Sequence, residues 1–324
     1  MSTEKVWMHR ALKLAVLGLG KAQPNPLVGA VIVHNDNIIG EGFHQQYGAP
    51  HAEVNAINAV ENHELLKKST IYVNLEPCSH YGKTPPCASL IVEKQIPKVV
   101  IGMRDPNQKV NGKGIEMLKN EGVEVIENVL KEESMLLNKR FITWHTKKRP
   151  YIFLKWAQTK NGFMDINRME VEHNIHTKYW ITNEALSIWT HKMRNEEQAI
   201  LIGYNTLLND NPQLTNRFYG SNQPQRFVWC DEREPRIKSD SFIFLKGEIT
   251  DVLDELYGQN IQSVIVEGGK KLLQRFLDAN LWDEIFVLVG NIEWTNGTLA
   301  PNIPFNSNTI LTIDNDSILQ SFNY

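Results

Sequence analysis

Residues 70–94 read TIYVNLEPCSHYGKTPPCASLIVEK, and the class of fold can be inferred from this stretch and its neighbours. Thr70–Leu75 is a short apolar run with β-branched and aromatic residues, which predicts a strand. Ala88–Lys94 has the apolar spacing of a helix. Cys78 and Cys87 lie between the two elements. A strand, a loop and a helix in succession indicate a layered α/β fold.

The sequence on both sides repeats this alternation. Val28–Val33 and Ile38–Phe43 flank an Asn35-Asp36-Asn37 turn, which predicts a β-hairpin. The other predicted elements are a first helix with Trp7, Ala11, Leu14 and Ala15 on one face, a helix at 51–61, strands at 98–103 and 123–126, and a helix at 114–120. We therefore expect an α/β layer sandwich in the first half of the chain.

The second half begins a new series of elements. A polar helical stretch around Leu130–Pro150 ends in Lys147-Lys148-Arg149-Pro150, and Pro150 is a plausible boundary. Predicted strands follow at 151–157, 199–203, 226–230, 264–266 and 285–289, with helices at 184–194, 252–257 and 270–279. They predict a second, mainly parallel sheet. A chain of 324 residues is longer than one hydrophobic core usually supports. We therefore expect two domains, 1–146 and 147–324.

The composition excludes several classes of protein. The formal net charge of −3 weakens any interpretation as a general nucleic-acid binder. Three cysteines, an odd and sparse count, argue against a disulfide framework and favour a reducing compartment. No apolar run reaches the roughly 20 residues that span a bilayer. We expect a cytoplasmic protein without membrane partners.

The strongest chemical signal is His51-Ala52-Glu53, followed by Cys78 and Cys87, each preceded by proline. One imidazole and two thiolates suit a tetrahedral Zn²⁺ whose fourth position is left for water. Glu53 follows the histidine by two residues at a helix start, so it can face that water without binding the metal. We expect Glu53 to take a proton from water and deliver it to the departing nitrogen.

Simpler interpretations exist for each of these residues. A histidine before a helix is often a cap, and two cysteines nine positions apart could be buried thiols. The joint occurrence with Glu53 favours one catalytic zinc ion per chain, held by His51, Cys78 and Cys87. Cys230 has no such surroundings, so we expect it in the core.

The order of these residues matches a known signature. His-x-Glu followed by Pro-Cys and a further cysteine marks zinc-dependent nucleobase deaminases. The long gap from Cys78 to Cys87 departs from the nucleoside and tRNA deaminases and resembles the deaminase domain of the bifunctional riboflavin-biosynthesis deaminase/reductase family. The matching stretches are Pro24-Asn25-Pro26, Gly42-x-His44, Gly48-x-Pro50-His51, Glu76–Cys87 and Asp105-Pro106-Asn107.

The resemblance implies a cytidine-deaminase-like three-layer sandwich acting on a phosphorylated pyrimidine. In that family the substrate is a diaminopyrimidinone with a ribosylamino 5′-phosphate, which loses the amine on the ring carbon between the two ring nitrogens. Asn25 and Asp105 would hydrogen-bond the pyrimidine or the ribose. Lys83 would contact the phosphate, although a single loop lysine can equally be solvated.

The second half carries a weaker signal by itself. The predicted strand Val264–Val266 runs through Glu267-Gly268-Gly269 into a helix, where backbone amides could hold a phosphate or simply form a turn. No G-x-G-x-x-G motif follows a predicted strand. This half nevertheless resembles the reductase domain of the same family, an α/β fold akin to dihydrofolate reductase. The matching stretches are 154–157, 180–182, 206–217 and 266–269.

This second resemblance implies reduction of the ribosyl group to ribityl by NADPH, with hydride addition at the first sugar carbon. The implied cofactor-binding residues are Gln158, Trp180, Thr206, Asp210, Gly268 and Gly269. The implied substrate-binding residues are Lys178, Arg194, Leu214, Arg217 and Glu267. Lys155 and Glu267 are candidates for polarising or protonating the opened sugar, and a strand-end salt bridge is the alternative.

One position departs from the family pattern. Asn161, in Lys160-Asn161-Gly162, stands where the family usually has aspartate. Asparagine keeps the hydrogen-bonding shape and loses the charge. If that carboxylate assists hydride transfer or substrate alignment, we expect a weakened reductase.

Four functions follow from these observations. The first is the bifunctional deaminase and reductase, and related enzymes generally self-associate, which implies a homo-oligomer. The second keeps only the deaminase, with a non-catalytic C-terminal domain. A nucleic-acid-editing deaminase would need a basic face, which the acidic balance disfavours. A zinc-stabilised interaction protein would have no use for Glu53.

Overall fold

The structure of the protein is a computed structural model that describes residues 2–79, 85–107, 110–168, 180–231, 235, 239–303 and 307–323. The chain divides into two compact units, an N-terminal unit of Met1–Lys147 and a C-terminal unit of Lys148–Tyr324. None of the helices in the described ranges is long and apolar enough to cross a membrane.

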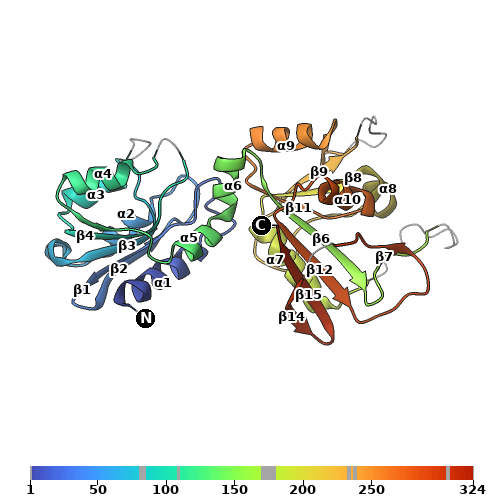
Figure 1. Ribbon diagram of the computed structural model, residues 1–324, viewed down its shortest axis with the longest axis horizontal. Helices are drawn as coiled ribbons and strands as arrows, with labels where there is room; N and C mark the ends of the chain where they lie inside the picture. The colour runs from blue at the N-terminus through green and yellow to red at the C-terminus, as the bar shows by residue number, and fades with distance from the viewer. Residues whose placement is uncertain are drawn as a thin grey trace. The chain divides into compact units, whose positions relative to one another are not determined.

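The N-terminal unit, drawn in blue to green in Figure 1, contains a five-stranded sheet. Its strand order is β2-β1-β3-β4-β5. β1 is antiparallel to β2 and β3, whereas β3, β4 and β5 are parallel. The elements in chain order are α1 (Thr3–Val16), β1 (Gly29–His34), β2 (Asn37–Phe43), α2 (Ala52–Asn58), the 3-10 helix η1 (His63–Lys68), β3 (Thr70–Leu75), α3 (Cys87–Glu93), β4 (Lys98–Met103), α4 (Lys113–Asn120), β5 (Glu124–Ile126), α5 (Lys131–Leu137) and α6 (Lys139–Lys147).

Helices cover both faces of this sheet because its strands are apolar on both sides. Successive side chains of a strand point to opposite faces. Ile71 and Val73 of β3 therefore pack in the core beneath α2, α3 and α4, whereas Tyr72 packs in the core on the side of α1. The predicted three-layer sandwich is confirmed.

The predicted hairpin is also confirmed. His34, the last residue of β1, pairs with Asn37, the first residue of β2. Asn35 and Asp36 form the two-residue loop with φ angles of 47° and 59°. A loop with two left-handed residues matches the twist of the strands, and Asn and Asp tolerate that conformation better than most residues.

The C-terminal unit is built on an eight-stranded sheet with the order β10-β9-β8-β11-β6-β12-β15-β14. The first six strands in this order are parallel, and β15 and β14 extend the sheet antiparallel. The elements are β6 (Tyr151–Thr159), β7 (Phe163–Asp165), α7 (Glu184–Glu196), β8 (Ala199–Gly203), α8 (Tyr204–Asp210), β9 (Gln225–Trp229), β10 (Ile243–Leu245), α9 (Ile249–Gly258), β11 (Ser263–Val266), α10 (Lys270–Asp278), β12 (Glu284–Gly290), β13 (Thr298–Leu299), β14 (Asn308–Ile313) and β15 (Asp316–Phe322).

Two hydrophobic cores lie on the faces of this sheet. One contains side chains of α9 and α10, and the other contains side chains of α7 and α8. Cys230 is fully buried in the second core, as expected from the sequence. The fold class predicted for this half, a mainly parallel α/β sheet, is confirmed.

Several elements of the C-terminal unit had no sequence prediction, namely α8, β7, β10, β13, β14 and β15. β7, β10 and β13 are only two or three residues long. In β14 every side chain is exposed or half-buried, so the strand lacks a buried apolar face. Strand assignment from sequence depends on several residues with such a face, which explains why β14 and the three short strands were missed.

Candidate functional sites

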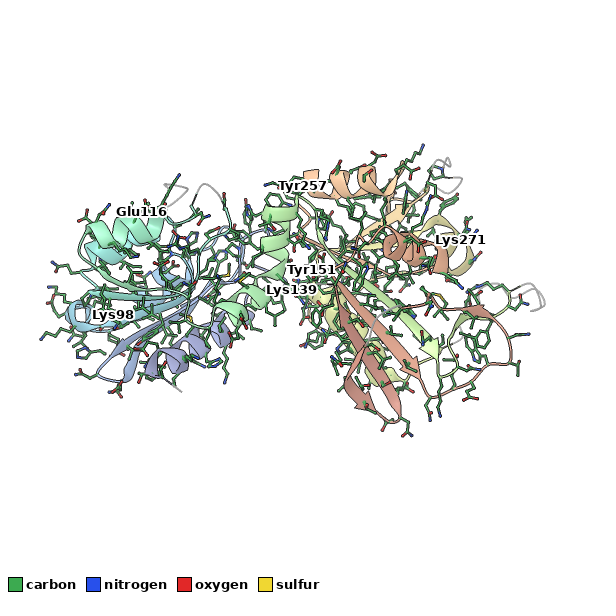
Figure 2. The ribbon with its side chains drawn as sticks, in the orientation of Figure 1. Lys98, Glu116, Lys139, Tyr151, Tyr257 and Lys271 are labelled. Atoms are coloured by element: carbon green, nitrogen blue, oxygen red, sulfur yellow. The ribbon has the colours of Figure 1, made fainter. Side chains whose placement is uncertain are left out.

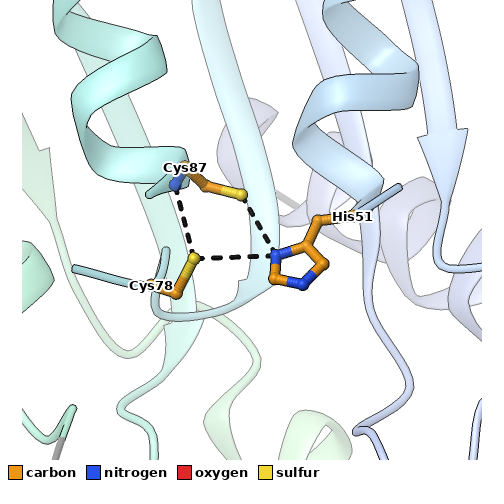
Figure 3. A group of neighbouring side chains, drawn as sticks. All are labelled: His51, Cys78 and Cys87. Atoms are coloured by element: carbon orange, nitrogen blue, oxygen red, sulfur yellow. Dashed lines mark hydrogen bonds between the residues drawn. The ribbon is translucent and has the colours of Figure 1, made fainter. Parts of the chain in front are cut away.

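His51, Cys78 and Cys87 converge in the N-terminal unit (Figure 3). His51 Nδ1 lies 3.3 Å from Cys87 Sγ and 3.6 Å from Cys78 Sγ. The three candidate ligand atoms all lie within 4.8 Å of one another. The structure thus brings together the three residues that the sequence proposed as zinc ligands.

Local backbone geometry explains the convergence. His51 is the N-cap of α2, with φ −70° and ψ 163°, so its imidazole leaves an extended backbone just before the helix. Cys87 is the first residue of α3, and Cys78 follows the end of β3. The Cys87 backbone N–H donates to Cys78 Sγ over 3.3 Å. One helix start therefore supplies both a ligand and a hydrogen bond to the other sulfur.

His51, Cys78 and Cys87 shift one another's pKa. The Cys87 thiol lowers the pKa of Cys78, and Cys78 in turn raises the pKa of His51. Cys78 and burial together raise the pKa of Cys87. A cation that binds thiolate and neutral imidazole would displace these protons.

Glu53, the second residue of α2, is 3% exposed. Burial, and next to it the nearby Cys78 sulfur, raise the pKa of Glu53 to about 7, while His51 and the Cys87 thiol oppose the shift. The carboxyl group thus lies beside all three candidate ligands. In the described part of the chain, the group of possible metal ligands consists of His51, Cys78 and Cys87 and does not include Glu53. Glu53 therefore lies next to the ligand group without being part of it.

Asn25 is connected to the candidate metal site through His44. In the sequence, His44 was noted only as part of a motif. His44 Nδ1 lies 3.1 Å from the Pro50 carbonyl, which can only accept a hydrogen bond, so Nδ1 carries the proton. His44 Nε2 then accepts from the Asn25 amide over 3.0 Å. The rings of His44 and His51 contact each other edge to face with centroids 5.7 Å apart.

Asp105 follows β4 and is buried. Its Oδ1 accepts the Asn107 N–H over 2.8 Å. Burial raises the pKa of Asp105 to about 6 despite that hydrogen bond, and the negative charges of Glu76 and Cys78 add to the rise. Lys83, the expected phosphate contact, lies outside the described residues.

A cavity of about 560 Å³ opens in the C-terminal unit. Ten of the twelve residues that the sequence analysis assigned to the reductase line it: Lys155, Trp180, Arg194, Thr206, Asp210, Leu214, Arg217, Glu267, Gly268 and Gly269. Gln158 is not in the lining, and its Oε1 accepts the indole N–H of Trp156 over 2.9 Å. Lys178 lies outside the described residues.

Lys155, Glu267 and Arg194 form a buried charge cluster in the lining of this cavity. Leu154 pairs with Val266 on the neighbouring parallel strand, so the next residues, Lys155 and Glu267, are also neighbours. Glu267 accepts from Arg194 over 2.8 Å and lies 3.6 Å from Lys155 Nζ. The strand-end salt bridge that was the alternative interpretation of Lys155 and Glu267 is therefore present, and its residues line the cavity.

Each charge in this cluster shifts the pKa of its neighbours. Burial lowers the pKa of Lys155, only partly offset by Glu267. Burial alone would raise the pKa of Glu267, but Arg194 and Lys155 outweigh it and keep the pKa below its ordinary value. The cluster therefore contains a firmly ionised carboxylate beside a lysine that gives up its proton more easily than usual.

Arg217 reaches the cavity from the loop after α8, and His191 of α7 supports it. The Arg217 backbone N–H donates to His191 Nδ1 over 2.9 Å. Burial, and then the charges of Arg194 and Arg217, lower the pKa of His191 to about 4. His191 lines the cavity, and the sequence analysis missed it because a lone histidine in a helix gives no signal.

The turn between β11 and α10 has left-handed glycines, with φ 127° at Gly268 and 59° at Gly269. A Cβ on Gly269 would lie 3.1 Å from Thr206 Oγ1, so the backbone of the turn lies close to Thr206. Both glycines and Thr206 also line a second cavity of about 480 Å³. Lys271, labelled on α10 in Figure 2, lines both cavities.

Two other cavity residues have distinct surroundings. Asp210 pairs with Arg168 over 2.6 Å, and Arg168 also binds Asp165 over 2.7 Å. Trp180 is 67% exposed, a large apolar surface at the cavity. Arg168 was not predicted, because no motif of the sequence analysis contained it.

Two family models match this chain. Residues 1–103 match the cytidine and deoxycytidylate deaminase zinc-binding region. Residues 150–292 match the RibD C-terminal domain. Riboflavin biosynthesis protein RibD of Aquifex aeolicus is 37% identical over 316 residues, covering 88% of this chain and 86% of that protein.

The chain belongs to the RibD family. The RibD of Escherichia coli is 32% identical over 328 residues, covering 88% of this chain and 87% of that protein. The crystal structure of a diaminohydroxyphosphoribosylaminopyrimidine deaminase/5-amino-6-(5-phosphoribosylamino)uracil reductase from Thermotoga maritima superposes with a TM-score of 0.86 at 36% identity, covering 98% of this chain and 97% of that one. An Acinetobacter baumannii RibD structure gives 0.87 at 31% identity, with 98% of each chain covered.

Membership of the RibD family settles the general function. This chain is a riboflavin-biosynthesis enzyme with a deaminase and a reductase domain. The interpretations as an editing deaminase and as a non-catalytic zinc protein are therefore wrong. The expectation of a bifunctional enzyme is confirmed.

Proposed function

We propose that residues 1–146 hold one zinc ion and deaminate a diaminopyrimidinone ribosylamino 5′-phosphate, and that residues 147–324 reduce the ribosyl group of the product to ribityl with NADPH. The observation that carries the proposal is the convergence of His51, Cys78 and Cys87 beside the buried Glu53. The Thermotoga maritima protein, whose name states both reactions, supports the choice of substrates.

The donor set fits zinc. One imidazole nitrogen and two sulfurs lie close enough for a single cation, and such a mixed set suits Zn²⁺ better than the oxygen-preferring cations. When bound there, zinc would supply the Lewis acidity that makes water nucleophilic near neutral pH. Glu53 would accept the proton of the attacking water and pass it to the departing amine. Its burial keeps bulk water from competing for that proton.

Asn25, Asp105 and Lys83 are the proposed substrate contacts of the deaminase. The amide N–H₂ of Asn25 is engaged by His44, which leaves Oδ1 as the atom to accept an N–H of the pyrimidine. Asp105 would accept a second hydrogen bond from the ring or the ribose. Lys83 would neutralise the phosphate.

The turn between β11 and α10 supports the proposed NADPH site. The left-handed glycines of the β11–α10 turn expose backbone amides beside Thr206, where a dinucleotide phosphate can approach closely. Asp210, Trp180 and Gln158 would complete the cofactor site, together with Thr206, Gly268 and Gly269. Bound NADPH would supply the hydride for the sugar carbon.

The substrate of the reductase would bind over the charge cluster. The cavity lining carries six basic side chains, Lys155, Arg168, Arg194, Arg217, Lys270 and Lys271, against the three carboxylates of Asp165, Asp210 and Glu267, which favours a phosphorylated ligand. Leu214 and Lys178 would complete the contacts. Lys155 is the proposed proton donor or polarising group for the opened sugar, since its lowered pKa eases proton release.

The proposal also includes the setting of the enzyme. We expect it in the cytoplasm as a homo-oligomer that binds small phosphorylated pyrimidines, with no nucleic-acid or membrane partner.

The Glu53→Gln variant of the full-length protein tests the proposal. Glutamine keeps the shape of Glu53 and removes the proton acceptor, so we expect a loss of about 10²- to 10⁴-fold in the deamination rate. Zinc content and NADPH oxidation with deaminated substrate should stay unchanged. Deamination at the wild-type rate would contradict the role of Glu53, and a wild-type protein that deaminates without metal would contradict the zinc site.

A further inference from the structure

Glu76 is a buried carboxylate directly before Pro77-Cys78, and it is 3% exposed. Its Oε1 accepts the backbone N–H groups of Gly114 at 3.0 Å and Ile115 at 3.4 Å. Its Oε2 accepts those of Gly112 at 3.0 Å and Asp105 at 3.2 Å. Four main-chain amides therefore converge on one side chain.

The chemistry of these contacts favours a carboxylate over any other side chain. α4 begins with Gly112 as its N-cap, so the helix has no capping side chain of its own. The Glu76 oxygens supply the missing acceptors, and hydrogen bonds from amides to a carboxylate are about twice as strong as neutral ones. An amide side chain would turn an N–H₂ group toward two N–H donors.

The contacts join three segments around the ligand group. The Glu76 backbone N–H donates to the Met103 carbonyl over 2.9 Å, which ties the ends of β3 and β4. Cys78 lies two residues after Glu76, and Asp105 lies two residues after Met103. At Gly114 a Cβ would lie 2.0 Å from the Pro77 carbonyl oxygen, so the start of α4 packs directly on the loop that leads to Cys78.

We propose that Glu76 is a positioning residue of the deaminase. Its carboxylate holds the loop of Cys78, the backbone of Asp105 and the start of α4 at fixed separation, so a metal ligand and a substrate contact are set by one side chain. This inference rests on the proposed function of His51, Cys78 and Cys87 as metal ligands.

The experiment uses the full-length protein loaded with Co²⁺ in place of zinc, because the absorption of Co²⁺ reports its geometry and its thiolate ligands. In the Glu76→Gln variant we expect an altered Co²⁺ spectrum, faster loss of metal to a chelator, and a fall of about 10- to 100-fold in kcat/KM for deamination. NADPH oxidation with deaminated substrate should stay at the wild-type rate, which shows that the C-terminal unit is folded, and a circular-dichroism spectrum like that of the wild type checks the rest of the chain.

Three further variants separate positioning from general stability. Leu66→Ala removes a buried side chain of the same unit, so it should lower the melting temperature and leave the Co²⁺ spectrum unchanged. Glu76→Asp keeps the charge and should recover part of the loss. Gly114→Ala, which pushes on the Pro77 carbonyl without changing charge, should alter the spectrum as Glu76→Gln does.

Two results would overturn the inference. One is a Glu76→Gln protein with the wild-type Co²⁺ spectrum and wild-type kcat/KM. The other is a set in which Leu66→Ala changes the spectrum as much as Glu76→Gln, since Glu76 would then act only on stability. A wild-type protein that gives no thiolate–Co²⁺ absorption would overturn the proposed metal site itself, and this inference with it.

Discussion

In the N-terminal unit the candidate ligands His51 and Cys87 are 36 positions apart, whereas the C-terminal cavity is lined by residues from Lys155 to Thr298. The first group is assembled by two helix starts and one loop. The second depends on the register of parallel strands, which places Lys155 beside Glu267. A compact motif thus builds one site, and the whole sheet builds the other.

The two sites also differ in how they balance charge. The thiol and imidazole groups of the first site shift each other's pKa, and a bound cation would replace their protons. The positive charge that balances the thiolates would therefore come from a bound ion. In the cavity, Glu267 is balanced by Lys155 and Arg194 from within the fold. Substitutions should therefore affect mainly chemistry in the first site, and both chemistry and stability in the second.

The largest effect is expected from Cys78→Ser, which removes one of the three candidate ligands. We expect the zinc content to fall and deamination to drop by about 10³-fold or more, since a lost metal removes several kcal/mol of transition-state stabilisation. NADPH oxidation with deaminated substrate should not change. Metal analysis with the two separate assays checks this. A parallel loss of both activities would show that the two sites are not independent.

A smaller but broader effect is expected from Glu267→Gln, which leaves two buried cations without their partner. Removing one member of a buried ion pair costs about 3–5 kcal/mol. Urea unfolding followed in the C-terminal unit and NADPH oxidation should both be affected, while deamination persists. Glu284→Gln is the matched control, because Glu284 is also buried in this unit and lies outside the cavity lining. Equal effects of the two variants would contradict the role of Glu267.

The pH dependence of stability gives a further test of the cavity. The pKa of His191 is about 4 in the folded protein and about 6.5 in an unfolded chain. Between these values the unfolded chain binds a proton that the folded protein does not, so stability should fall as the pH drops from about 6.5 to about 4. His191→Gln, whose side-chain oxygen can accept the Arg217 N–H, should weaken that dependence. Thermal denaturation across this pH range measures it, and identical curves would exclude His191.

The difference between the two sites also explains how much of each could be predicted from the sequence. The ligand group could be predicted because its residues stand in short motifs with distinctive spacing, and the structure brings all three together. His44 and Glu76 stood in those motifs without a role, since only their contacts reveal what they do. His191 and Arg168 could not be found, because the strand register and loop path that bring them to the cavity leave no local pattern. The hairpin of β14 and β15 was missed for lack of a buried apolar face in β14.

The smallest effect is expected at Asn161, where the resemblance implied an aspartate. Asn161 Nδ2 donates to the Trp294 carbonyl over 2.7 Å, and its Oδ1 accepts from Thr159 Oγ1 at 2.8 Å and from the Trp294 N–H at 3.3 Å. Aspartate would keep the two accepted hydrogen bonds and lose the donated one. One exposed hydrogen bond is worth about 1 kcal/mol, or about fivefold in binding. Trp294 lines the cavity, so this contact can influence ligand binding.

Asn161→Asp therefore separates two interpretations of this position. If the amide serves to hold Trp294, the variant should raise KM by about fivefold and leave kcat unchanged. If a carboxylate at this position assists hydride transfer, the variant should raise kcat instead. Steady-state NADPH oxidation with deaminated substrate distinguishes the two, and Asn161→Ala, which removes all three hydrogen bonds, should raise KM further without raising kcat. An increase in kcat for Asn161→Asp alone would mean that this chain has a reductase weakened by the loss of one charge.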